Sequence, residues 1–144
     1  MSDITITNTR PEHLAALAEH QKICFPTLDP SEWMTVEHFA SHLRLFPEGQ
    51  HVALDGDRVV GYARLCQTGL SHRLEHGLTA VRHSHRRRGL GSALKQAQIK
   101  WAADNGYREL TSEMVEGNAP MRALNERLGY RQLPPVIIVG GSAR

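Results

Sequence analysis

The residues best suited to chemistry lie in one stretch, His85-Arg86-Arg87-Arg88-Gly89-Leu90-Gly91-Ser92. Three arginines lead into a Gly-x-Gly turn, and a helical pattern follows it. Glycine lets the backbone approach a ligand, and the first turn of a helix leaves amides unpaired at the positive end of the helix dipole. Such a turn binds phosphate groups without a metal ion. The stretch therefore predicts a diphosphate site at residues 86–92.

Other phosphate-binding classes fit this stretch poorly. A nucleotide triphosphatase loop places Lys and then Ser or Thr after its last glycine, whereas here Ser92-Ala93-Leu94 follows Gly91. A dinucleotide-binding turn places a third glycine where this chain has Leu94, and its acidic ribose partner closes a strand, whereas Glu109 begins one. An RNA-binding surface needs stacking aromatics, and residues 82–92 contain none.

Size and composition predict one domain over residues 1–144, because 144 residues with 40% hydrophobic content suffice for one core and not for two. A net charge of +2 and a pI near 8.7 are too mild for a dedicated nucleic-acid binder. Cys24 and Cys66 form neither a disulfide framework nor a metal motif, which suits a reducing compartment. With no signal segment at the start, we expect a cytoplasmic protein.

The elements that must position the arginines alternate between strands and helices. Apolar and β-branched runs predict strands near residues 4–6, 52–54, 59–63, 73–81, 108–114 and 136–139. Helical spacing predicts helices that end before Pro26, that run from Thr35 to Pro47, that follow the arginines, and that span residues 119–128. Asp55-Gly56-Asp57 predicts a hairpin turn. A mixed α/β sheet protein follows, with a parallel crossover around the main helix.

The main helix carries one apolar stripe, which predicts its buried face. Lys95, Gln96 and Lys100 do not belong to the stripe, and we expect them away from the core. The stripe consists of Leu90, Ala93, Leu94, Ala97 and Trp101.

Arg86-x-x-Gly89-x-Gly91, together with Asn118-Ala119-Pro120-Met121 and Leu128-Gly129-Tyr130, resembles the GNAT superfamily of acyl-CoA-dependent N-acyltransferases over roughly residues 50–130. The resemblance implies an α/β (α+β) fold with a mixed, mostly antiparallel central sheet flanked by helices and containing a splayed strand pair. It also implies acetyl-CoA as co-substrate, with no metal.

In this family the diphosphate lies on the amides of the loop and the pantetheine arm follows the strand before it, here ending at Val81. Gly77 suits a departure of that strand from its neighbour, and the amide of Val81 or a neighbour is our candidate oxyanion donor. Asn118 is both a predicted helix N-cap and a family contact to pantetheine. The donor-binding residues that we predict are Thr79, Ala80, Val81, Arg86, Arg87, Arg88, Gly89, Leu90, Gly91, Ser92 and Asn118.

Two carboxylates compete for the role of general base. Glu75 lies eleven positions before Arg86, as the catalytic glutamate does in histone-acetylating relatives. Glu113 lies five positions before Asn118, as the base does in relatives that acetylate ribosomal proteins, and we prefer it slightly. A chain of water molecules is the third alternative.

Many relatives place a tyrosine acid close to the sulfur, seven residues after the motif asparagine, where this chain has Asn125. An amide donates a hydrogen bond and does not deliver a proton. Tyr130, Tyr107 or solvent are the substitutes. We expect slower chemistry rather than none, because a thiol with a pKa near roughly 8.5 leaves tolerably as its anion.

The sequence thus predicts an N-acetyltransferase that moves an acetyl group from acetyl-CoA directly to a primary amine on a small molecule or a protein. The alternative is a non-catalytic acyl-CoA-binding or regulatory module of the same fold. We expect neither nucleic acid nor membrane as partner, and the resemblance leaves a homodimer open. His38 and His42 share a helix face without a third ligand, so they predict no metal site.

Overall fold

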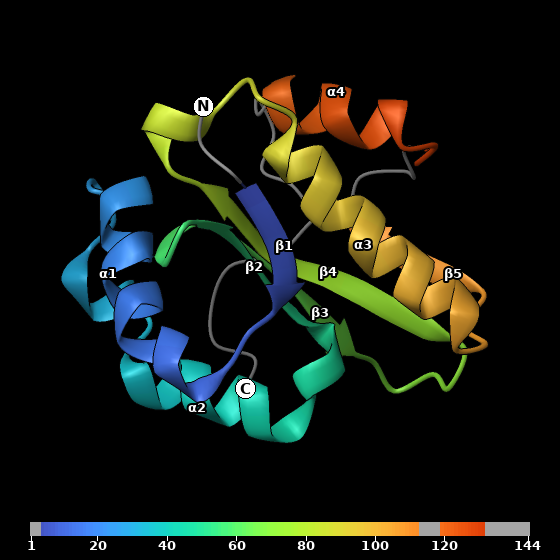
Figure 1. Cartoon of the computed structure of the whole chain (residues 1–144). Coiled ribbons are helices and arrows are strands. Elements are labelled where there is room, and N and C mark those ends of the chain that lie inside the picture. The colour runs from blue at the N-terminus through green and yellow to red at the C-terminus, as the bar shows by residue number, and fades with distance from the viewer. Residues whose placement is uncertain (1–3, 113–118, 132–144) are drawn as a thin grey trace, which may run out of the picture.

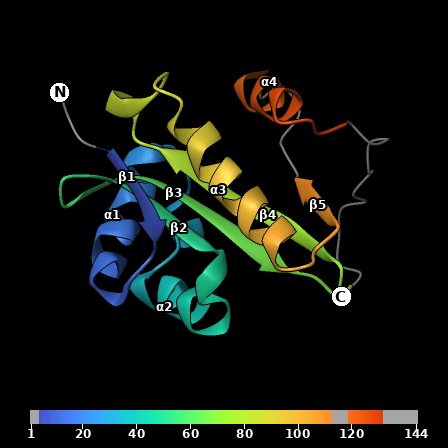
Figure 2. The same cartoon turned by 45° about the vertical axis from the view of Figure 1, so that its right-hand side comes forward.

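The computed structural model describes residues 4–112 and 119–131. Figure 1 shows a central sheet with α1 and α2 on one side and α3 and α4 on the other, and Figure 2 shows the same layers from another angle. The strands are β1 (Ile4–Asn8), β2 (Gln50–Asp55), β3 (Arg58–Gln67), β4 (Arg73–Val81) and β5 (Glu109–Ser112). The helices are α1 (Leu14–Cys24), α2 (Val36–Leu45), α3 (Leu90–Asp104) and α4 (Ala119–Arg127).

The sheet has the order β1-β2-β3-β4-β5. The pairs β1–β2, β2–β3 and β3–β4 are antiparallel, and β4–β5 is parallel with α3 as its connection. The mixed, mostly antiparallel sheet is therefore confirmed, as is the hairpin, whose Gly56 has a φ of 63°. The strand predicted near residues 136–139 lies outside the described residues.

Alternation along the strands separates two cores. Val52 of β2 packs with Leu17 of α1 and Phe39 of α2 on one face of the sheet. The next residue, Ala53, packs with Leu90 and Leu94 of α3 on the other face. Because successive side chains of a strand point to opposite faces, one run of buried residues holds helices on both sides. We refer to these faces as the α1/α2 face and the α3 face.

Strand β4 is irregular at its centre. Leu65 of β3 pairs with His76 and Ala63 pairs with Thr79, so β4 carries one more residue than β3 over this interval. The extra residue is accommodated at Gly77–Leu78, and a Cβ at Gly77 would lie 3.0 Å from Cys66 Sγ. Such a bulge increases the local twist and redirects the strand. This bulge lies between β3 and β4, directly after the last described pair of β4 with β5, His76↔Ser112.

The pairing of β4 with β5 is short. It runs from Arg73↔Glu109 to His76↔Ser112, and β4 continues to Val81. Ser112 is also the last residue that the structure describes before residues 113–118. In Figure 2 the label β5 marks this short strand beside the much longer β4.

Candidate active site

The loop over residues 86–92, which we call the arginine loop, links β4 to α3. A 3-10 turn, His83–His85, follows β4, and Arg86, Arg87 and Arg88 are then exposed. Arg87 has a φ of 65° and Gly89 a φ of 76°, both in the left-handed region. A left-handed non-glycine residue stores backbone strain, and such strain concentrates at ligand sites. The conformation at Gly89 explains why a glycine stands there.

The start of α3 leaves its first amides available. Gly89 is the N-cap residue and provides no side chain to cap the helix. The first helical hydrogen bond runs from the Ala93 amide to the Gly89 carbonyl at 2.9 Å, so the amides of Leu90, Gly91 and Ser92 precede that ladder. With three exposed guanidinium groups beside them, these amides fit a diphosphate.

A buried histidine anchors the arginine loop to the hairpin. His85 is 7% exposed, and its Nε2 lies 2.8 Å from Asp55 Oδ2 at the end of β2. Its Nδ1 lies 2.7 Å from Ser84 Oγ. This contact fixes the residue that directly precedes the arginines. The sequence placed His85 in the informative stretch without assigning it this role.

The end of β4 presents an edge that β3 does not use. The amide of Arg82 donates to the Val60 carbonyl of β3 at 2.8 Å. Backbone groups alternate in direction along a strand, so the amide and carbonyl of Val81 face the opposite edge. Arg86 Nε donates to the Val81 carbonyl there at 2.9 Å. The predicted oxyanion donor at Val81 therefore faces away from β3.

Two further donor-binding candidates lie on the same strand. The Ala80 carbonyl is 3.1 Å from His20 Nε2 of α1, so this carbonyl already has a partner. The hydroxyl of Thr79 is buried and has no hydrogen-bond partner within residues 4–112 and 119–131. A buried unpartnered hydroxyl beside an open strand edge suits an amide-rich ligand. The hydroxyl of Thr79 and the amide of Val81 thus fit a pantetheine arm better than the carbonyls of Ala80 and Val81, which already have partners.

Of the two candidate bases, Glu75 lies within the described residues and Glu113 does not. His76 contacts Gln98 of α3, so alternation places its neighbour Glu75 on the α1/α2 face, half-buried and paired in register with Thr111 of β5. Glu113 lies outside the described residues, as does Asn118. Glu75 is therefore the base candidate that the structure positions, at the point where β4 and β5 stop pairing.

Asn125 is buried and forms a contact that the sequence did not predict. Its Oδ1 accepts a hydrogen bond from Lys95 Nζ at 2.6 Å, and Lys95 also donates to Ser112 Oγ at 3.3 Å. The Lys95 ammonium lies 5.8 Å from the centroid of the Tyr130 ring. We call Lys95, Asn125, Ser112, Tyr130 and His76 the Lys95 cluster.

A second chain of hydrogen bonds joins this cluster. His76 Nδ1 donates to Gln98 Oε1 at 3.1 Å, which leaves Nε2 to accept from the Tyr130 hydroxyl. Burial, and next the charge of Lys95, lower the pKa of His76 to about 4, so the ring is neutral at pH 7. Burial also raises the pKa of Tyr130 to about 12. Tyr107 stacks near Trp101 in another core cluster and is not part of this group.

The expectation that Lys95 lies away from the core is wrong. Lys95 is 1% exposed and Gln98 is 0% exposed, whereas Gln96 and Lys100 are exposed as expected. Helix α3 contacts the sheet on one side and α4 on another, so its buried face is wider than the apolar stripe. The spacing of apolar residues along a helix identifies a buried apolar face and does not reveal a buried lysine or glutamine. The sequence signal that could have indicated the burial of Lys95 was its position directly after Leu94 of the apolar stripe.

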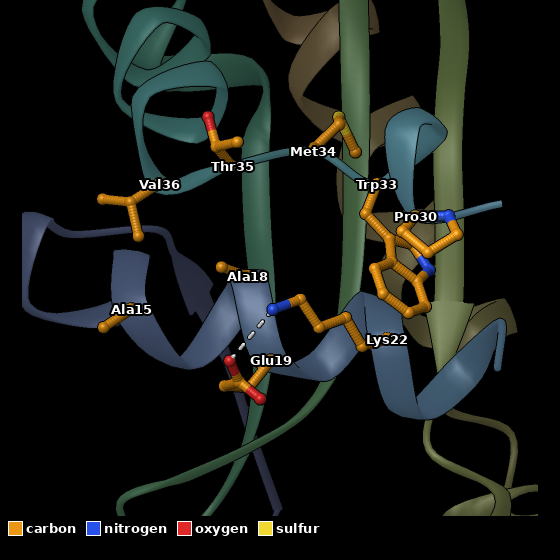
Figure 3. Close-up of a pocket in the computed structure, with 9 residues that line it drawn as sticks. All are labelled: Ala15, Ala18, Glu19, Lys22, Pro30, Trp33, Met34, Thr35 and Val36. Atoms are coloured by element: carbon orange, nitrogen blue, oxygen red, sulfur yellow. Dashed lines mark hydrogen bonds and ion pairs between the residues drawn. The ribbon is translucent and has the colours of Figure 1, made fainter. Parts of the chain in front are cut away.

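A cavity of about 440 Å³ lies between α1 and the segment that leads into α2 (Figure 3). Trp33 and Met34 line it, whereas Phe39 and Phe46, from the same region of the sequence, pack in the core. Lys22 Nζ lies 5.6 Å from the Trp33 ring centroid and contacts Glu19, one turn away on α1. No residue of the arginine loop or the Lys95 cluster lines this cavity.

Two features are absent from the described residues. No group of three or more His, Cys, Asp or Glu side chains is arranged to hold a metal ion there. Within the same residues, no helix is both long and apolar enough to span a membrane.

The sequence profile of the acetyltransferase (GNAT) family matches residues 14–130, which is more than half of the chain. The chain belongs to this family. A search of curated protein sequences found no significant match. Both cores, the arginine loop and α4 fall within the matched residues.

Several solved structures share the fold. Ribosomal-protein-alanine N-acetyltransferase from Brucella melitensis superposes with a TM-score of 0.78 at 22% identity, over 90% of this chain and 86% of that one. Ard1 from Thermoplasma volcanium gives 0.77 at 21% identity, over 91% and 84%. AAC(6')-Iy, in complex with the bisubstrate analogue CoA-S-monomethyl-acetylneamine, gives 0.75 at 18% identity, over 99% and 100%.

Proposed function

We propose that this GNAT protein transfers an acetyl group from acetyl-CoA directly to a primary amine. The observation that carries the proposal is the arginine loop, where exposed guanidinium groups and the free first-turn amides of α3 meet the open end of β4. A diphosphate there gains charge-assisted hydrogen bonds, each worth roughly 1.5–3 kcal/mol. Support also comes from the solved neighbour whose ligand joins CoA to an amine-bearing compound.

In this proposal each step of the reaction is assigned to particular residues of the chain. The arginine loop binds the diphosphate, and Thr79 and Val81 hold the pantetheine arm on the open edge of β4. Glu75 approaches from the α1/α2 face and accepts a proton from the attacking nitrogen. The amide of Val81 lies along the arm rather than at its reactive end, so an amide of β4 near the bulge at Gly77–Leu78 stabilises the oxyanion. Glu113 stays an alternative base.

The test of donor binding is isothermal titration calorimetry with acetyl-CoA. Arg86→Ala combined with Arg87→Ala should weaken binding at least about tenfold, because one lost charge-assisted contact is worth that much. Arg44→Ala combined with Lys100→Ala removes the same charge from exposed positions on α2 and farther along α3, and should change affinity less than about threefold. Equal losses in both double variants would contradict the loop assignment.

A second candidate is an acyl-CoA-binding module without turnover. It is favoured by Asn125, which cannot deliver a proton and is engaged with Lys95. Incubation with acetyl-CoA and a panel of amines, with detection of free thiol, separates the two. Thiol release that depends on the amine supports the enzyme. Thermal stabilisation by acetyl-CoA without thiol release supports the module.

A further inference from the structure

The Lys95 cluster contains a buried charge that no carboxylate of residues 4–112 or 119–131 pairs with. Lys95 is 1% exposed, and its two hydrogen-bond acceptors, Asn125 and Ser112, are neutral. Among the residues that the structure describes, no carboxylate forms an ion pair with it. Burying an ammonium costs several kcal/mol unless it is well paired, and an apolar residue of similar volume is often more stable in such a place. The arrangement therefore indicates a use for the charge.

The cluster lies where the pairing of β4 with β5 ends, and beyond it no strand within the described residues occupies this edge of β4. Ser112 is the last residue of β5 and pairs with His76, so β5 occupies the edge up to that point. A ligand arm that leaves the arginine loop and follows the edge back from Val81 runs over Thr79 and Leu78. It stops at His76 and Ser112, where β5 pairs with this edge of β4. The reactive end of the arm thus arrives beside Lys95, whose ammonium contacts Ser112.

We infer that Lys95, held by Asn125, stabilises by its positive charge the thiolate that departs from an acyl-CoA. This inference rests on the proposed function. When the C–S bond breaks, its electron pair stays on sulfur, and the thiolate pairs with the Lys95 ammonium, which keeps its proton. The base passes the proton of the acceptor nitrogen to solvent, and the thiolate takes a proton from solvent as CoA leaves.

The titratable groups around Lys95 agree with this role. Burial lowers the pKa of Lys95 to about 8, which still leaves most of the group charged at pH 7. From β4, His76 is neutral at pH 7 because its pKa is about 4. From the end of α4, Tyr130 stays protonated because its pKa is about 12. Glu113, which follows Ser112, lies outside the described residues.

The test measures the thiol of bound CoA and needs no acceptor. The protein is saturated with CoA and titrated with base, and the thiolate is followed by its ultraviolet absorption, with the acetyl-CoA complex as the blank. An ammonium beside the sulfur should lower the pKa of the bound thiol from about 8.5 to between about 5.5 and 7.5. Lys95→Met should return it to near its value in free CoA and leave acetyl-CoA affinity within about threefold.

Lys100→Met is the matched control, because it removes a lysine from the exposed side of the same helix and should behave as the wild type. If Lys95→Met does not fold, Lys95→Gln replaces it. An unshifted thiol in the wild-type complex overturns the inference without any variant, and so does a Lys95→Met protein with the wild-type shift. Failure of the wild type to bind acetyl-CoA at all refutes the proposed function and this inference with it.

Discussion

The backbone of Arg87 provides a direct test of the arginine loop. Its φ of 65° costs a non-glycine residue about 1–2 kcal/mol, and Arg87→Gly removes that cost. Glycine also loses more backbone entropy on folding, by roughly 0.5–1 kcal/mol. The variant should therefore lie between unchanged and about 1.5 kcal/mol more stable than the wild type. Because the side chain is exposed, little packing is lost.

Arg88→Gly is the matched control. Arg88 is also exposed and is not among the residues with positive φ, so glycine brings only its entropy cost there and should destabilise by about 0.5–1 kcal/mol. Both variants remove one guanidinium from the same loop, so the change in charge repulsion nearly cancels between them. Their free energies of unfolding should differ by about 1–2 kcal/mol, which is the strain itself.

Urea denaturation without ligand, followed by circular dichroism, measures these free energies. The same samples titrated with acetyl-CoA should both bind more weakly than the wild type, since each has lost a cation beside the diphosphate. Stability and affinity then change in opposite directions for Arg87→Gly. Equal stabilities of Arg87→Gly and Arg88→Gly would refute the left-handed conformation, and with it the idea that strain shapes the loop for its ligand.

Three further predictions concern single residues. Gly91→Ala should be as stable as the wild type or up to about 1 kcal/mol more stable in thermal unfolding, because the new Cβ meets Leu124 at an ordinary 3.5 Å. The same variant should bind acetyl-CoA more weakly, because the ligand approaches this backbone. Since Lys95 has a folded pKa of about 8 against 10.5, the unfolded state binds more protons, and stability should rise by about 2 kcal/mol from pH 7.5 to 9.5. Urea titrations at both pH values should find that this rise is absent in Lys95→Met and retained in Lys100→Met. The folded pKa of His76 is about 4 against 6.5, so this residue alone should lower stability by about 2 kcal/mol from pH 7 to 5. His76→Gln should therefore lose about 2 kcal/mol less than the wild type over this range, and an equal loss in both proteins would contradict this.

The sequence predicted much of the fold, because its local signals agree with the tertiary arrangement. The strand expected at residues 73–81 coincides with β4, and the Asp55-Gly56-Asp57 turn joins β2 to β3. The glycine at position 89 is required by a single backbone angle, which any fold containing this turn demands. Such features depend on neighbours in the chain, so a pattern of residue types is enough to identify them.

Contacts between distant segments were decided only by the tertiary structure. Lys95 looked like a solvated lysine beside an apolar stripe, and its burial depends on α4 covering that side of α3. Asn125 looked like the loss of a proton donor, and the fold instead joins its amide to an ammonium 30 positions earlier in the chain. The residue types of the arginine loop were enough to predict it, because its charges and glycines act locally. Burial arises from packing between elements, which no spacing within one helix records.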